Sequence, residues 1–256
     1  MSGLDLGFSV VGPEDAPLLV LSGSLGTTAE LWDGQIDALA RGFRVVRHDP
    51  PGHGASPVPE EPFEISDVGR AILDFVDGLG AGSFSVCGLS MGGHAAMWLV
   101  ANVPERVNAV VLCCTAARLG TPGGWLERAG LVRWQGIEPA VDRARAVWFT
   151  DAFVGASAAE HFFETLRTVP PEGYALCCEA IGRFDFREQL HLVTAPTLVV
   201  SGSSDPAVDA AERERLTARL PNVASVVVPA AHLANVEQPD AVTEAILRHV
   251  ETRAAA

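Results

Sequence analysis

The stretch VCGLSMGGHAAMW, residues 86–98, constrains the fold of this chain more than any other. Ser90 follows an apolar run at 84–87, which indicates a short buried strand, and precedes a run at 94–100 that indicates a helix. Because almost no loop separates the two, the backbone must turn sharply at Ser90. Gly88 and Gly92 lie two positions to either side, where such a turn leaves no room for a side chain. The pattern Gly-x-Ser-x-Gly therefore predicts a strand–turn–helix elbow that presents the Ser90 hydroxyl.

The elbow fits a larger alternation of strands and helices. Short apolar runs, expected to be strands, lie at 17–22, 43–48, 84–87, 107–112, 196–201 and 224–228. Helical patterns fall between most of them, near 28–40, 66–79, 91–101, 208–219 and 236–250. Strands that are apolar on both faces and alternate with helices are typical of a parallel sheet covered on both sides. We therefore predict an α/β fold with a mostly parallel central sheet.

The alternation stops in the middle of the chain. Residues from about 117 to 190 indicate one helix after another, with no convincing strand. We therefore predict two parts: a core formed by 1–116 and 191–256, and an inserted all-helical cap formed by 117–190.

Composition excludes several classes of function. The net charge of −14 argues against nucleic acid and against anionic membrane surfaces as partners. No apolar run reaches the length of a membrane span, and we expect no secretory signal at the N-terminus. The five cysteines include the neighbouring pairs Cys113-Cys114 and Cys177-Cys178, which form no recognisable disulfide framework. We therefore expect reduced thiols and a cytoplasmic location.

A serine hydroxyl needs a base before it can act as a nucleophile. His232 follows the last apolar run and precedes the last helix, so we expect it at the same sheet edge as Ser90. His94 lies one helical turn after Ser90, but its side chain should point along the helix. His53 lies in a Gly-His-Gly turn, where a structural role is expected. His232 is therefore the predicted general base.

The base in turn needs an acid that orients it. In a sheet of this kind, the acid follows the nucleophile and precedes the histidine in the chain. Asp205 fits, because it lies directly after the run at 196–201, and Asp209 is the weaker candidate. Asp205 also suits the alternative role of capping the next helix.

A developing oxyanion needs two backbone N–H donors. We expect one from Met91, directly after the nucleophile, and the other from Leu25 in the loop SGSLGTT. That loop can also be a glycine-containing turn with no catalytic role. His48, Asp49 and His53 cluster nearby, but their spacing matches no standard ligand motif, so we expect no metal.

With this constellation, the sequence resembles the α/β-hydrolase superfamily and, within it, the 3-oxoadipate enol-lactonases. The resemblance covers about residues 21–240, and the segments VLCCTAARLGTP, GYALCCEAI and HLANVEQP point to the lactonase. It implies serine-dependent hydrolysis of 3-oxoadipate enol-lactone through an acyl-enzyme, with no cofactor. Two positions depart from the family pattern: Gly23 stands for a usual Asn, and Pro51 for a usual Arg.

The resemblance also implies a small anionic substrate, which an acidic protein can bind only through a local cation. Arginine suits a carboxylate, because its guanidinium can bond both oxygens. The cap offers Arg128, Arg133, Arg143 and Arg145, and we select Arg133 beside Trp134, near the middle of the cap. The alternative is a solvated surface arginine, or one that is paired with Glu127 or Glu138. Trp125, Trp134 and Trp148 are candidates for the pocket wall or for helix packing.

Two other functions stay open at this point. One is hydrolysis of another small ester or lactone, or of a carbon–carbon bond, on the same fold. The other is a ligand receptor that uses the pocket for binding with little turnover, which an intact Ser90, Asp205 and His232 argues against. The sequence gives no indication of the oligomeric state.

Overall fold

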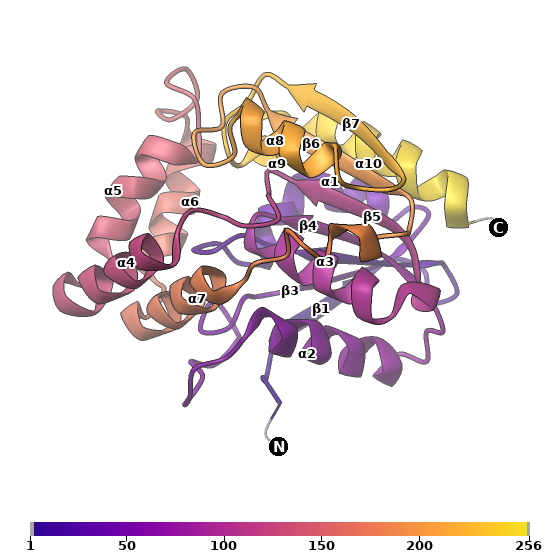
Figure 1. The fold of residues 1–256 in the computed structure, drawn as a ribbon, viewed down its shortest axis with the longest axis horizontal. Coiled ribbons are helices and arrows are strands. Elements are labelled where there is room, and N and C mark those ends of the chain that lie inside the picture. Colours follow the sequence, from indigo (N-terminus) through magenta and orange to yellow (C-terminus); the bar gives the residue numbers. More distant parts are fainter. Residues whose placement is uncertain (1–2, 255–256) are drawn as a thin grey trace.

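A seven-stranded sheet runs through the computed structural model, which describes residues 3–254 (Figure 1). The strand order is β1-β3-β2-β4-β5-β6-β7, and only the pairing of β1 with β3 is antiparallel. The strands are β1 (Phe8–Val11), β2 (Leu18–Ser22), β3 (Arg44–His48), β4 (Phe84–Leu89), β5 (Val107–Cys113), β6 (Thr197–Gly202) and β7 (Val223–Val228).

Helices cover both faces of this sheet (Figure 1). On one face, α3 (Met91–Asn102) packs on β2, β4 and β5, with α2 (Ile65–Gly78) beside it. On the other face, α10 (Pro239–Ala254) packs on β5, β6 and β7, with α1 (Asp33–Leu39) beside it. The remaining short helices of the core are α8 (Ala210–Thr217), α9 (Ala234–Glu237), η1 (Ala29–Trp32), η2 (Pro104–Arg106) and η3 (Leu190–Leu192). Strands β2, β4 and β6 are buried along their whole length, as expected of a sheet covered on both faces.

This architecture confirms the predicted α/β fold and adds one strand that the sequence analysis misses. Strand β1 has only four residues, and its last two are exposed, so it lacks the buried apolar run that marks the other strands. Two predicted helices are divided: 28–40 becomes η1 followed by α1, and 236–250 becomes α9 followed by α10, which begins at Pro239. Proline suits the first turn of a helix but not its interior, which explains the second division.

Four consecutive helices lie between β5 and β6 and extend to one side of the sheet (Figure 1). We call them the helical block: α4 (Pro122–Gln135), α5 (Glu138–Val147), α6 (Ser157–Arg167) and α7 (Pro171–Arg183). Helices α4 and α7 pack closely against each other, and α5 contacts both α4 and α6. These helices lie within the predicted cap. The division into a core of 1–116 and 191–256 and a cap of 117–190 stays a prediction.

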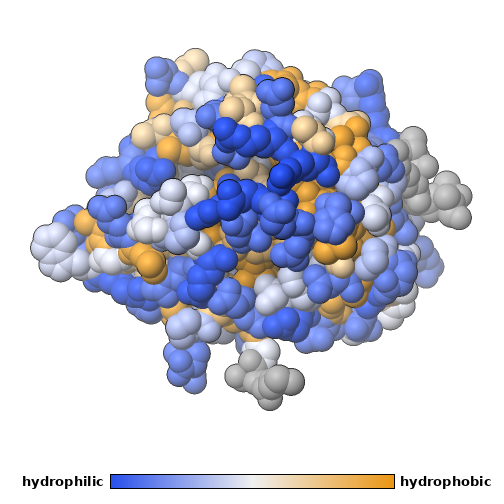
Figure 2. All heavy atoms as spheres, viewed as in Figure 1, coloured by the Kyte–Doolittle hydropathy of each residue, from blue (hydrophilic) through white to orange (hydrophobic). Residues whose placement is uncertain are grey.

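The surface agrees with the acidic composition. The face drawn in Figure 2 is mainly hydrophilic, and its hydrophobic residues are scattered in small groups. Among residues 3–254, no helix combines the length and the apolar character that crossing a membrane would require.

The parallel register brings four loops to one edge of the sheet. Neighbouring strands end in step, because Gly88 pairs with Ser22, Leu89 with Cys113, and Gly202 with Val228. The loops that follow these strand ends contain, in chain order, Leu25, Ser90, Asp205 and His232. The fold thus brings together residues that lie up to about 200 positions apart in the sequence.

Candidate active site

Ser90 occupies the predicted elbow, between the last residue of β4 and the first residue of α3. Its φ of 56° and ψ of −113° lie in a region that a residue with a side chain rarely adopts. A Cβ added at Gly88 would lie 2.1 Å from the Gly92 carbonyl oxygen, and one at Gly92 would lie 2.1 Å from the Ser22 carbonyl oxygen. Close backbone approach therefore explains why both flanking positions are glycine.

Backbone and side-chain bonds hold the strained turn in place. The Ser90 N–H donates to the Cys113 carbonyl at 3.0 Å, and the Thr115 hydroxyl donates to the Ser90 carbonyl at 2.8 Å. Strain of this kind persists only where the surroundings fix it. Here strand β5 and the residues after it supply that fixation, and the Ser90 side chain faces a cavity.

Asp205 and His232 meet at the same edge. The Nδ1 atom of His232 lies 2.9 Å from Oδ2 of Asp205, and both residues are almost fully buried. The other oxygen, Oδ1, accepts the N–H groups of Ala207 at 2.8 Å and Val208 at 3.2 Å. A carboxylate fixed in this way holds a hydrogen on Nδ1 and leaves Nε2 as the free proton acceptor. His232 lines the same cavity as Ser90.

The competing candidates have other partners. Asp209 caps α8 by accepting the Glu212 N–H at 2.9 Å. His94 is fully buried beneath the elbow, where its Nε2 bonds the Ala116 carbonyl at 3.1 Å and its ring stacks on Phe184. Burial lowers the pKa of His94 to about 3, so the ring stays neutral. Both residues therefore have structural partners away from the hydroxyl of Ser90.

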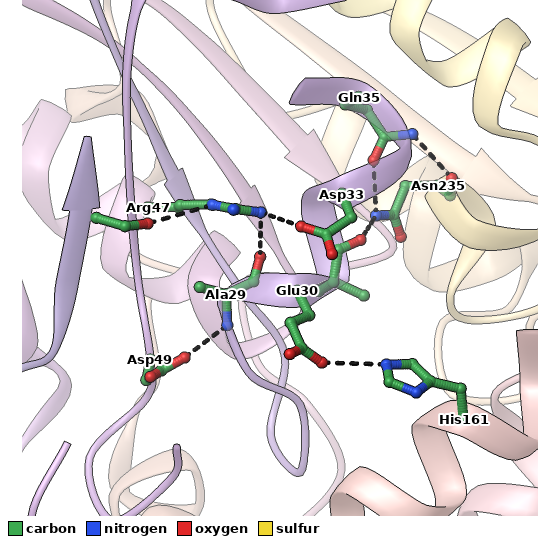
Figure 3. Close-up of polar contacts among 10 residues, drawn as sticks. Ala29, Glu30, Asp33, Gln35, Arg47, Asp49, His161 and Asn235 are labelled. Carbon is green, nitrogen blue, oxygen red and sulfur yellow. Dashed lines mark hydrogen bonds and ion pairs between the residues drawn. The ribbon is translucent and has the colours of Figure 1, made fainter. Parts of the chain in front are cut away.

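The loop that carries Leu25 is held by the turn that contains His53. The Gly26 N–H donates to Nε2 of His53 at 3.0 Å, and Nδ1 of His53 bonds the Pro51 carbonyl at 2.9 Å. These two bonds require the neutral tautomer with its hydrogen on Nδ1. Asp49 supports the next residues by accepting the N–H of Ala29 (Figure 3). The Gly-His-Gly turn predicts a structural role for His53, but nothing in the sequence indicates that its partner is Gly26.

Leu25 itself lines the cavity beside Ser90, and Met91 begins α3. The first N–H groups of a helix have no partner within it, so the N–H of Met91 is available at the elbow. The Gly92 N–H donates to the Gly23 carbonyl at 2.9 Å, which ties the loop to the helix. The arrangement can place two backbone donors near the Ser90 hydroxyl.

The cavity has a volume of about 600 Å³ and lies between the sheet edge and the helical block. Ser90, His232 and Leu25 belong to the core side. Much of the remaining wall is apolar and comes from the block or the segment leading into it, with Leu119, Trp125, Leu131, Val132, Val147 and Trp148. A site of this size suits a small organic molecule.

Two arginines bring positive charge into this wall. Arg128 donates to the hydroxyl of Tyr174, and its guanidinium lies 5.0 Å from the ring centre of Trp125. Arg143 also lines the cavity, and its burial, together with the charge of Arg128, lowers its pKa. Among the residues that the structure describes, no carboxylate forms an ion pair with either arginine, although Glu127 also lines the cavity. Two unpaired guanidinium groups can bind an anion.

Arg133 and Trp134 do not line the cavity, so the expectation that they bind the substrate is wrong about their position. Arg133 bonds Glu172 and Glu179 on α7, and Trp134 is 80% exposed. The predicted alternative partners, Glu127 and Glu138, are not the ones that Arg133 uses. Arg145 pairs with Glu160. Trp125 and Trp148, in contrast, line the cavity as the pocket-wall hypothesis requires.

Helix geometry explains the difference between the two arginines of α4. Arg128 follows Trp125 by three residues and therefore shares its face. Arg133 follows Arg128 by five residues, which rotates it by about 140° away from that face. The spacing from Trp125 was the sequence signal that could have selected Arg128.

Comparisons with known proteins agree with this geometry. A family profile for the alpha/beta hydrolase fold matches residues 16–135. The chain is 37% identical to 3-oxoadipate enol-lactonase 2 of Acinetobacter baylyi, over 94% of this chain and 91% of that protein. It is 35% identical to 3-oxoadipate enol-lactonase 1 of the same organism, over 93% and 90%. The crystal structure of the enol-lactonase from Burkholderia xenovorans LB400 superposes with a TM-score of 0.93 at 34% identity, covering 96% of both chains.

Proposed function

The chain belongs to the 3-oxoadipate enol-lactonase family of the α/β hydrolases, and we propose that it hydrolyses 3-oxoadipate enol-lactone to 3-oxoadipate. The observation that carries this proposal is the composition of one cavity. Its core side presents Ser90 and His232, and its opposite wall presents Arg128 and Arg143. A small lactone with a carboxylate side chain needs both a nucleophile and a cation in one cavity.

The hydrolysis proceeds in two halves. The Ser90 hydroxyl attacks the ring carbonyl while Nε2 of His232 takes its proton, and Asp205 stabilises the resulting imidazolium. The N–H groups of Leu25 and Met91 stabilise the oxyanion of the tetrahedral intermediate. Collapse breaks the bond to the ring oxygen, which leaves as an enol with the proton from His232 and tautomerises to the ketone.

Water completes the reaction. His232 removes a proton from a water molecule, which attacks the acyl-enzyme, and a second tetrahedral intermediate forms in the same oxyanion site. Its collapse releases the carboxylate product and returns the proton to Ser90. Every proton and bond change is provided by Ser90, His232, water and substrate, so we assign no metal or organic cofactor to the reaction.

Arg128 and Arg143 serve as the anchor for the substrate carboxylate, in place of Arg133. Tyr174 and Trp125 hold the Arg128 guanidinium from two sides, with ring centres 5.3 and 5.0 Å away. A guanidinium held in this way loses little freedom when it binds a carboxylate. The helical block thus acts as a cap that recognises the substrate, while the core carries out the reaction.

The cellular setting is part of the proposal. All five cysteines are free thiols, which supports a reducing cytoplasm. The net charge of −14 supports a small-molecule substrate rather than nucleic acid or a membrane surface.

A steady-state assay with enzymatically generated enol-lactone tests the function. We expect a kcat/KM in the ordinary enzyme range of about 10⁴–10⁸ M⁻¹ s⁻¹. A panel of neutral lactones, aryl esters and carbon–carbon hydrolase substrates is measured beside it. A higher kcat/KM on any panel member would reassign the substrate, and binding without turnover would favour a receptor.

A further inference from the structure

The loop that carries His232 is bonded to the end of helix α5. The Leu233 N–H donates to the Trp148 carbonyl at 2.9 Å, and the His232 N–H donates to the Val147 carbonyl at 3.4 Å. Val147 and Trp148 also line the cavity. The end of α5 therefore both lines the cavity and is hydrogen-bonded directly to the backbone of the predicted general base.

A single carboxylate joins the same two segments. Oε2 of Glu237 accepts the Ala231 N–H at 3.0 Å and the Thr150 N–H at 3.3 Å, and Oε1 accepts the hydroxyl of Thr150. Ala231 directly precedes His232, and Thr150 follows Trp148 by two residues. Glu237 is half-buried, and no cation pairs with it among the residues that the structure describes. Its carboxylate is therefore stabilised by hydrogen bonds from these three neutral donors.

Glu237 does not stabilise its own helix in this position. It is the last residue of the four-residue helix α9, and a carboxylate at a helix C-terminus faces the unfavourable end of the dipole. Its bonds run to the two neighbouring segments instead. The position of Glu237 is explained by the connection that its carboxylate makes between Ala231 and Thr150.

On the core side, Asn235 holds the same loop. Its Nδ2 donates to the Leu31 carbonyl at 2.7 Å and to Oε1 of Gln35 at 3.2 Å, while Nε2 of Gln35 donates to the Asn235 carbonyl at 2.9 Å (Figure 3). These bonds fix the loop to η1 and α1, which follow the loop of Leu25. The bonds of Glu237 are the counterpart on the side of the helical block.

We propose that Glu237 is a positioning residue, which clamps the His232 loop to the end of α5 and so sets the position of the imidazole relative to Ser90. Asp205 orients the ring, and Glu237 fixes the backbone that carries it. The inference rests on the proposed role of His232 as general base. It assigns to the helical block a part in the chemical step, in addition to substrate recognition.

The test is the Glu237→Met variant, assayed on the enol-lactone and on a neutral aryl ester. Methionine keeps about the length of the side chain, but it has no oxygen to accept the two N–H groups and the hydroxyl that Glu237 receives. A misplacement of about 1 Å can reduce a rate by about 100-fold, so we expect kcat to fall by about 10- to 100-fold on both substrates. KM should change by less than about threefold, because the cavity wall stays in place.

Two further variants separate positioning from general loss of structure. Asp209→Asn is the matched control, since it also changes a carboxylate that accepts a backbone N–H, and its kcat should stay within about twofold of wild type. Thr150→Val removes one donor to Glu237 and should lower kcat less than Glu237→Met does. In the double variant the two losses should not multiply, because both changes break the same clamp.

All rates are expressed per active site, counted by titration with a serine-directed phosphonate. A kcat per active site within twofold of wild type in Glu237→Met would overturn the proposal, as would losses that multiply in the double variant. If the wild-type chain hydrolyses the aryl ester but not the enol-lactone, the proposed substrate is wrong. The Glu237 test then still holds, because the aryl ester also requires His232.

Discussion

The sheet edge and the helical block face the same cavity but are built differently. At the edge, Ser90, Asp205 and His232 are at most 7% exposed. Backbone N–H groups hold all three: those of Ser90 and His232 donate to carbonyl groups, and the Asp205 carboxylate accepts the N–H of the residue two positions later. In the block, Arg128 and Arg143 reach the cavity from helix surfaces, without any carboxylate partner in the described part of the chain. Under the proposed function, the reaction therefore depends on fixed backbone geometry, whereas substrate choice depends on side chains that helices present.

Replacing the proposed nucleophile, Ser90, is the most severe way to test the core side of this comparison. Ser90→Ala should lower kcat/KM for the enol-lactone by about 10⁶-fold, the size of loss known for a triad serine. The melting temperature should change little, because alanine fits the elbow as serine does. A loss of kcat/KM of less than tenfold in a folded Ser90→Ala protein would show that Ser90 is not the nucleophile.

The proposed acid, Asp205, is tested by a pair of variants in one loop. Asp205→Asn should lower kcat by about 10⁴-fold, because the amide stabilises the wrong tautomer of His232. Asp209→Asn, four residues away, should leave kcat within about twofold, since Asp209 caps α8. The reverse ranking of the two kcat values would exchange their roles.

Much of the core side could be predicted because its signals are local. The elbow needs only five consecutive residues, and the buried strands are short apolar runs. Strand β1 escaped prediction because half of it is exposed and it carries no such run. The bonds from His53 to Gly26 and from Glu237 to Thr150 escaped it too, because they join residues 27 and 87 positions apart.

The helical block was predicted as helices, but its functional side chains were not. On α4, the spacing from Trp125 favours Arg128 over Arg133 only once Trp125 is known to face the cavity, and the tertiary structure supplies that knowledge. The predicted choice relied on the position of Arg133 in the sequence. The structure instead gives Arg133 two carboxylate partners on α7.

A pH test probes the buried histidine that supports the loop of Leu25. Burial lowers the pKa of His53 to about 4. Between about pH 6.5 and pH 4, His53 is therefore protonated in the unfolded chain but neutral in the folded protein. Stability should therefore fall as the pH decreases from about 6.5 to about 4, with a contribution of roughly 3 kcal/mol from His53. Below pH 4 this group adds no further change. Urea unfolding of wild type and His53→Gln at pH 7 and pH 4.5 measures it, and equal losses on acidification in both proteins would contradict it.

The block side is tested by its two unpaired arginines. Arg128→Ala and Arg143→Ala should each raise KM for the anionic lactone by the equivalent of about 1.5–3 kcal/mol, the size of a hydrogen bond to a charged group. KM for a neutral aryl ester should change little, because that substrate has no carboxylate. Steady-state kinetics on both substrates provide the measurement. Equal increases in KM on the two substrates would indicate loss of packing around Trp125 instead of loss of an anion site.

Arg133→Ala is the matched control for Arg128→Ala, since the same change is made on the same helix, five residues further on. Arg133 bonds Glu172 and Glu179 at the surface, where an ion pair contributes about 0–1 kcal/mol. KM for the enol-lactone should therefore equal that of wild type, and the melting temperature should fall slightly, by an amount that decreases with added salt. A KM increase confined to the anionic lactone would show that Arg133 reaches the substrate after all. The division between a cavity face and a solvent face of α4 would then be wrong.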